Sequence, residues 1–259
     1  SAPNIRIFPA ISGAVGMARQ RYPRNITPIP RVTHLPYPIL SARIPPKNGM
    51  KYTVGIEYVF PINRMGGIGL GIHYGQTKTV LEANEFSYSY RILDDENDIL
   101  DYKAYGCDVK ESQVINALEI PVYYQIRGKS VFLNIGPEIA IPIKAEYNTT
   151  AGDVELTGYY PKYNVELKDL PNHGFGQYDL AGNHGRLETR VTWGINAAVG
   201  YCYPLGTVDI NVSVYAKFLM NGYVDEANYL EYPSNIKSLS YVVGKQHLCS
   251  FGLSVGIGF

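Results

Sequence analysis

The residues with the clearest potential for chemistry are two carboxylates, Glu119 and Glu138, which flank a short turn. If the turn pairs Arg127 with Ser130, the two glutamates lie directly opposite each other on neighbouring strands. Facing buried carboxylates repel, so either one of them holds a proton or a cation lies between them. The cations available to this pair are Arg6, Arg190 and Lys217.

The ionisable residues of the strand candidates fall on the same alternate positions as the small residues, which predicts a polar interior. The predicted interior charge network consists of Glu57, His73, Glu119, Glu138, Arg190 and Lys217. One hypothesis is an acid pair or an ion-pair gate that can rearrange. The favoured alternative is a static network that holds a narrow barrel together, because structural ion networks also perturb pKa values.

No other pattern indicates a catalytic, cofactor or metal site. His73 has no second His or Cys at ligand spacing, and no serine in a strand candidate has a Gly-x-Ser-x-Gly setting. The acidic run at 94–98 does not fit a calcium loop with a glutamate at its twelfth position, so we expect a solvated loop tip there. The sequence therefore predicts a protein that is not an enzyme.

The strand that most clearly positions such an interior is the last one, 249–259. Its even positions carry only Ser and Gly, whereas its odd positions are large and apolar: Phe251, Leu253, Val255, Ile257 and Phe259. Successive side chains of a strand point to opposite faces, so one face is oily and the other nearly empty. A small-residue face fits the interior of a narrow barrel. A strand ending on Phe also resembles the assembly signal of Gram-negative outer membrane β-barrels.

Seven further stretches alternate in the same way. Together with the last strand, the predicted strands are 5–17, 51–61, 68–75, 114–127, 131–144, 190–203, 208–220 and 249–259. The connections between them alternate strictly between long and short. This pattern predicts an all-β fold, a single domain over 1–259 that forms an eight-stranded antiparallel up-and-down transmembrane β-barrel. We expect long extracellular loops, short periplasmic turns and periplasmic termini.

The amino-acid composition limits the classes of partner that we expect. The net charge is zero and charged residues make up only 18%, which argues against a nucleic-acid partner. No apolar run approaches the roughly 20 residues of a membrane helix, so any spanning must be done by strands. The chain holds 23 Tyr, and amphipathic aromatics suit a membrane boundary. The predicted interface aromatics are Tyr52, Tyr74, Tyr124, Trp193, Tyr203 and Phe218.

Two stretches also indicate a family. Residues 116–124 (NALEIPVYY) and 132–138 (FLNIGPE), with the Phe-terminated last strand, resemble the central hairpin of OmpA-like and PorT-like "porin family" barrels, the eight-stranded type found in Bacteroidota. The resemblance implies integral localisation in the outer membrane of a Gram-negative bacterium. It implies no activity and no cofactor.

These features predict a non-enzymatic outer membrane barrel with a closed polar core. We expect it to act as a structural or adaptor subunit, or as a surface-loop binding protein, in a larger envelope complex. Its expected partners are membrane lipids and proteins that meet its outer loops or its lipid-facing surface. A small porin that passes ions or very small solutes is the alternative, and an outer membrane enzyme is less favoured.

Overall fold

The computed structural model describes residues 4–15, 39–42, 48–94, 97–224, 238–239 and 248–258. Their elements are twelve strands in one sheet and a short 3-10 helix, which confirms the predicted all-β class. The predicted number of strands, eight, is wrong for this sheet. Within the described segments, no helix has the length and apolar character needed to cross a membrane.

Eight of the twelve strands correspond to the predicted stretches. They are β1 (Asn4–Val15), β3 (Asn48–Pro61), β4 (Gly66–Leu93), β5 (Ile99–Arg127), β6 (Val131–Tyr160), β10 (Thr192–Leu205), β11 (Val208–Leu219) and β12 (Cys249–Gly258). The elements that the sequence did not indicate are short: β2 (Ile39–Ala42), β7 (Val165–Leu167), β8 (Gly176–Asp179), β9 (His184–Arg186) and the 3-10 helix η1 (Pro171–His173).

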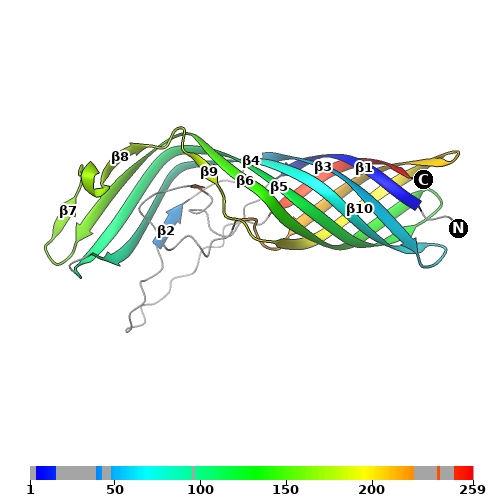
Figure 1. Cartoon of the computed structure of the whole chain (residues 1–259), viewed down its shortest axis with the longest axis horizontal. Coiled ribbons are helices and arrows are strands. Elements are labelled where there is room, and N and C mark those ends of the chain that lie inside the picture. Colours follow the sequence, from blue (N-terminus) through cyan, green and yellow to red (C-terminus); the bar gives the residue numbers. More distant parts are fainter. Residues whose placement is uncertain are drawn as a thin grey trace.

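The long strands pair antiparallel in the order β10-β11-β12-β1-β3-β4-β5-β6. In addition, β10 pairs with β6, from Thr192 opposite Ala140 to Tyr201 opposite Val131. Each long strand therefore has a long neighbour on both sides, and together they surround one interior, which we call the cylinder (Figure 1). β1 begins and β12 ends at the same end of the cylinder (Figure 1).

Three strands are much longer than predicted, with 28 residues in β4, 29 in β5 and 30 in β6. Beyond the cylinder they continue as a curved sheet, the arm, formed by 79–93, 99–113 and 145–160 (Figure 1). β7, β8 and β9 add to the arm through β6, and β2 adds to it through β4. The predicted long loops after 75 and 144 are therefore wrong, because most of that chain forms strands.

In the cylinder, the predicted alternation of side chains is confirmed. The large apolar residues of β3, β4, β6, β10, β11 and β12 point outward and are exposed, as shown by Ile56, Ile72, Ile135, Val214 and Leu253. Their alternate neighbours are small, or polar and buried. The outer surface of these six strands is thus largely aliphatic and aromatic.

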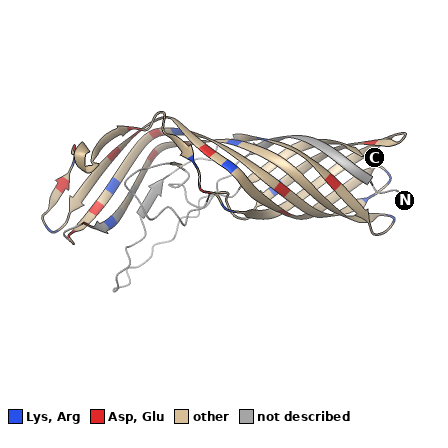
Figure 2. Ribbon diagram, in the orientation of Figure 1, with Lys and Arg blue, Asp and Glu red and all other residues tan. Residues whose placement is uncertain are grey.

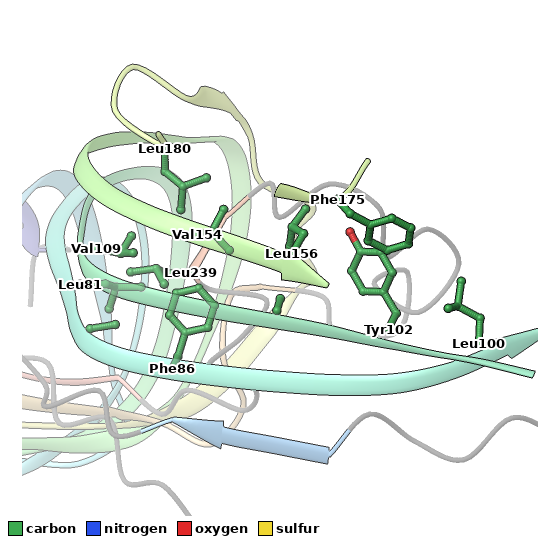
Figure 3. Close-up of a cluster of buried hydrophobic side chains, with 12 residues drawn as sticks. Leu81, Phe86, Leu100, Tyr102, Val109, Val154, Leu156, Phe175, Leu180 and Leu239 are labelled. Carbon is green, nitrogen blue, oxygen red and sulfur yellow. The ribbon is translucent and has the colours of Figure 1, made fainter. Parts of the chain in front are cut away.

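In the arm the polarity is reversed. Buried apolar side chains lie on the inner face of β4, β5 and β6, and contact one another as a separate cluster (Figure 3). The cluster consists of Leu81, Ala83, Phe86, Leu100, Tyr102, Ala104, Val109, Val154, Leu156, Phe175, Leu180 and Leu239. Phe175 and Leu180 come from the segment around β8, and Leu239 comes from the connection between β11 and β12. The arm therefore has a hydrophobic core of its own.

Local irregularities in β5 and β6 exchange the odd-numbered and even-numbered residues that point to the inner face. The inner face nevertheless stays continuous along each strand. On β5 the buried positions are even-numbered before Asp108 and odd-numbered after it, and Asp108 has a positive φ of 49°. On β6 they change near Lys144, where the register with β5 shifts, and again at Gly152, with φ of 129°. A side chain there would collide with the backbone of Val109, so glycine is needed at 152.

Candidate functional site

A layer of four buried charges crosses the middle of the cylinder. The Nζ atom of Lys217 on β11 lies 2.7 Å from Oε2 of Glu119 on β5 and 2.7 Å from Oε2 of Glu138 on β6. Lys51 on β3 forms an ion pair with the other carboxylate oxygen of Glu119. Glu119, Glu138 and Lys51 are at most 2% exposed. We call these four residues the charge layer.

Of the three cations that the sequence made available, Lys217 lies between the two carboxylates. The predicted register of β5 and β6, however, is wrong. Glu119 lies opposite Ala140, and Glu138 lies opposite Pro121. The reason is the turn: the amide of Gly128 donates to the carbonyl of Val131 at 2.8 Å, so the first strand pair is Arg127 with Phe132 rather than with Ser130. The carboxylates meet through Lys217, which reaches them from β11 across the interior.

A second cluster lies nearer to the short turns. Glu57 accepts a hydrogen bond from the Tyr123 hydroxyl at 2.5 Å on one oxygen, and its other oxygen lies 3.0 Å from Nε2 of His73. These three side chains come from β3, β4 and β5. The side chains of Glu57 and His73 are each 12% exposed.

Between these two clusters is a small cavity of ≈70 Å³. Glu57, His73, Tyr123, Glu138 and Lys217 contribute to its lining. A buried water needs about 10 to 15 Å³ of such space, so the cavity has room for only a few waters. Among the described residues, buried oxygens without a hydrogen-bond partner contribute to its lining, namely those of Thr53 (Oγ1), Glu138 (Oε1) and Tyr215 (OH), which makes the cavity a place for water.

Side chains of the described residues also lie at both ends of the interior. Toward the arm, Leu187, Leu219, Tyr223 and Val224 pack in one cluster with Ala140 of the cylinder wall. Toward the short turns, Nη2 of Arg127 lies 3.2 Å from Oδ2 of Asp209, and Gln125 donates to Asn134 at 2.9 Å. The arrangement is a packed polar core with apolar side chains at its arm end.

Arg190 is the predicted network member that the structure places elsewhere. It precedes β10, which begins at Thr192, and its Nε donates to the carbonyl of Gly222 at 3.3 Å. The residue therefore lies at the arm end of the interior and not beside Lys217. The alternation in the sequence extends beyond the true start of the strand, which is why the pattern misplaced it. Conversely, Lys51 was missed, although it has the inward parity of Glu57.

The predicted interface aromatics all point outward. Trp193, the single tryptophan, is 56% exposed, and the other five are also exposed: Tyr52, Tyr74, Tyr124, Tyr203 and Phe218. Tyr124 and Tyr203 lie near the short turns, whereas Trp193 lies near the arm end of β10. Of the predicted assembly signal, Phe251, Leu253, Val255 and Ile257 are exposed on the outer surface, and Phe259 lies outside the described residues.

The arm holds a buried carboxylate that the sequence did not reveal. Glu111 on β5 is fully buried and accepts hydrogen bonds from Nε2 of Gln113 at 2.6 Å, Oγ of Ser238 at 2.7 Å and the amide of Leu239 at 2.8 Å. Burial raises the pKa of Glu111 above its ordinary value, and these donors oppose that rise. Glu111 thus fixes the connection between β11 and β12 to the arm, a role that its inward parity alone did not predict.

At the far tip of the arm, the acidic turn is paired with β6 and the turn that follows it. Lys162 lies 2.6 Å from Oδ1 of Asp98, and the hydroxyl of Tyr160 donates to Asp94 at 2.7 Å. The hydrogen bonds from Lys162 and Tyr163 hold the pKa of Asp98 below its ordinary value. The described residues of the run that we expected to be a solvated loop tip, Asp94, Asn97 and Asp98, are held by hydrogen bonds.

Comparisons with known proteins do not identify a family. No family model matches the chain, and no curated protein matches it. Among solved structures, the search returns the crystal structure of a Pseudomonas aeruginosa FadL homologue, at 8% identity over 99% of this chain and 88% of that one, with a TM-score of 0.15. At that score the likeness carries no argument. The OmpA-like and PorT-like resemblance stays a prediction.

Proposed function

We propose that the chain is an integral outer membrane β-barrel without enzymatic activity, in which the eight long strands close through the β6–β10 pairing. The arm stands outside the membrane and serves as the binding part of a structural or adaptor subunit. In this proposal the short turns and both termini lie in the periplasm, as expected for a barrel of this type.

The observation that carries the proposal is the reversal of polarity along β4, β5 and β6. On β4, exposed Ile68, Ile72 and Tyr74 give way to exposed Gln76 and Lys78. Farther along the strand, Leu81, Ala83 and Phe86 lie on the buried inner face. The apolar side chains of one strand thus point outward in the cylinder and inward in the arm. Such a reversal is expected where the surroundings of the strand change from lipid to water.

The interior supports an adaptor more than a channel. An open pore needs a water-filled path, whereas the charge layer, the apolar cluster at the arm end and the Arg127–Asp209 pair fill the cross-section. Eight strands leave room for side chains and little else. The arm, with its own core and its pinned tip, is a rigid surface suited to a protein partner.

The membrane part of the proposal can be tested with Trp193, because it is the only tryptophan and it points outward. The protein is refolded into phosphatidylcholine vesicles, with or without bromine atoms on the acyl chains. We expect brominated lipid to quench Trp193 strongly and iodide in the water to quench it little. Efficient iodide quenching with no effect of bromine would refute a lipid-facing cylinder.

Planar bilayer recordings test the closed interior. We expect no stable openings from the wild-type protein at either polarity. A steady large conductance would replace the adaptor proposal with a channel. A pull-down from detergent-solubilised outer membranes, comparing the full chain with a variant that carries several charge changes on the outer surface of the arm, then tests whether the arm binds a protein.

A further inference from the structure

We propose that the outer surface where the arm leaves the cylinder binds the phosphate of a lipid headgroup through Lys78 and Lys144. This inference rests on the proposed membrane location. It concerns a set of exposed residues, with half-exposed Asn116 among them, that has no part in the interior network: Gln76, Lys78, Asn116, Lys144, Glu146 and Arg186, named the boundary patch.

The first argument is position. The exposed apolar surface ends at Tyr74 on β4 and at Ile143 on β6, and the next outward residues are polar on both strands. Lys144 would have faced inward on the parity of the preceding residues. The register shift between β5 and β6 turns it outward, and its side chain is 56% exposed. The cations therefore lie at the level where headgroups follow acyl chains.

The second argument is convergence. Lys78 pairs with Val114, and Lys144 pairs with Asn116, so the two lysines flank β5 two residues apart in register. Neighbouring strands are about 4.8 Å apart and residues rise about 3.3 Å along a strand, which separates the two lysine backbones by about 12 Å. Two flexible lysine side chains bridge such a distance to one phosphate. Between them, Gln76 donates to Oδ1 of Asn116 at 3.0 Å, which leaves the amide nitrogen of Asn116 as a further donor.

The third argument is charge. Glu146 lies 2.8 Å from Lys144 and opposite Arg186, so the patch holds three cations and one anion (Figure 2 shows basic and acidic residues side by side on β6 where it leaves the cylinder). Both members of the Lys144–Glu146 pair are more than half exposed, and such pairs contribute little. A phosphate can therefore compete with Glu146 for the lysine.

The test measures the affinity for a labelled phosphatidic acid in phosphatidylcholine nanodiscs that hold the full chain. A lysine near a charged membrane surface contributes about 1 kcal/mol, so K78Q and K144Q should each weaken binding about fivefold and together about thirtyfold. The variant E146Q should strengthen binding, because it frees Lys144, and a misfolded protein would not do this.

The matched control is K168Q. Lys168 pairs with Glu166 at 3.2 Å and is 51% exposed, but it follows β7 at the far end of the arm. We expect K168Q to bind like the wild type. The inference is overturned if the wild type prefers phosphatidic acid no more than phosphatidylcholine, if the double variant binds like the wild type, or if glycerol phosphate displaces the lipid at equal concentration. Failure to enter nanodiscs of any composition would instead refute the membrane proposal.

Discussion

The cylinder and the arm share the three strands β4, β5 and β6, yet the two parts are stabilised in opposite ways. In the cylinder, exposed Ile72 and Ile135 alternate with buried polar groups such as Glu138. In the arm, buried Leu81 and Val154 alternate with exposed or half-exposed polar positions. The difference shows that strand pairing does not depend on which face of the sheet is apolar. The surroundings of each half determine which face carries the apolar side chains.

The comparison also separates two kinds of core. The cylinder interior depends on ion pairs, in which each charge needs its partner, because an unpaired buried charge is costly. The arm depends on the burial of apolar side chains, which tolerates small changes better. The predictions that follow test this division, from the largest expected effect to the smallest.

Removing Lys217 should be the most damaging change. Lys217→Met leaves Glu119 and Glu138 buried without the cation between them, and breaking a buried pair costs about 3 to 5 kcal/mol. Urea unfolding in vesicles, followed through Trp193 fluorescence, measures the loss. The control is Lys103→Met on the arm, where the lysine lies over Tyr159 near the surface, and it should change stability by less than about 1 kcal/mol. Equal losses would remove the distinction between the two cores.

A charge on the outer surface should be harmful only on the cylinder. Leu253 is 60% exposed, and Leu253→Arg would place a cation against acyl chains at a cost of about 2 to 4 kcal/mol. Tyr105 is also exposed, on the arm, and has the carboxylate of Glu85 as a neighbour. Tyr105→Arg should be nearly neutral. The fraction of protein that folds into vesicles reports both, and a well-tolerated Leu253→Arg would contradict a lipid-facing cylinder.

Glu111 should make the arm less stable as pH rises. The pKa of Glu111 is raised on folding above its ordinary value of 4.5. Such a group contributes stability that is complete below the ordinary pKa and is lost as pH rises through the raised pKa. The slope for one such group is at most about 1.4 kcal/mol per pH unit. Amide exchange of the peptide containing Leu239 should therefore quicken across that window.

The variant Glu111→Gln should remove this pH dependence of the exchange protection, after correction for the intrinsic exchange rate. Glu166→Gln, in the exposed strand β7, serves as the control and should leave it intact. The interpretation fails if the slope survives in Glu111→Gln.

The smallest effect should come from the tip. Asp98→Asn weakens the bond to Lys162, but both partners meet solvent, and exposed pairs contribute below about 1 kcal/mol. We expect faster exchange of the turn at 94–98 and no change in the unfolding of the cylinder. A loss of cylinder stability would show that the two parts are coupled more tightly than their separate cores indicate.

The cylinder strands could be predicted from sequence because large apolar residues outside and small or charged residues inside give clean alternation. The arm could not. After Tyr74 the outward residues become polar, and around Asp108, Lys144 and Gly152 the parity of the buried positions changes. An alternating pattern that both reverses polarity and changes parity is hard to distinguish from a loop.

The interior network was partly predictable for the same reason. Parity alone was enough to place Glu57, His73, Glu119, Glu138 and Lys217 inside. Which of these residues contact one another depends on the strand register that a turn sets and on how far a side chain extends across the interior. The residue spacing in the sequence shows neither. The contact of Glu111 with Ser238 and Leu239 joins residues more than 120 positions apart, so no local pattern could show it.

The length of β6 has a mechanical consequence. Its fifteen residues past Ala145 extend, at about 3.3 Å each, along a path of about 50 Å. β5 pairs with β6, and β4 pairs with β5, along both the arm and the cylinder. A force at the tip is therefore transmitted through hydrogen-bonded strands to the cylinder wall around Lys217. The arm therefore acts as a stiff extension of the cylinder wall, which holds its tip at a set distance from the buried ion pairs.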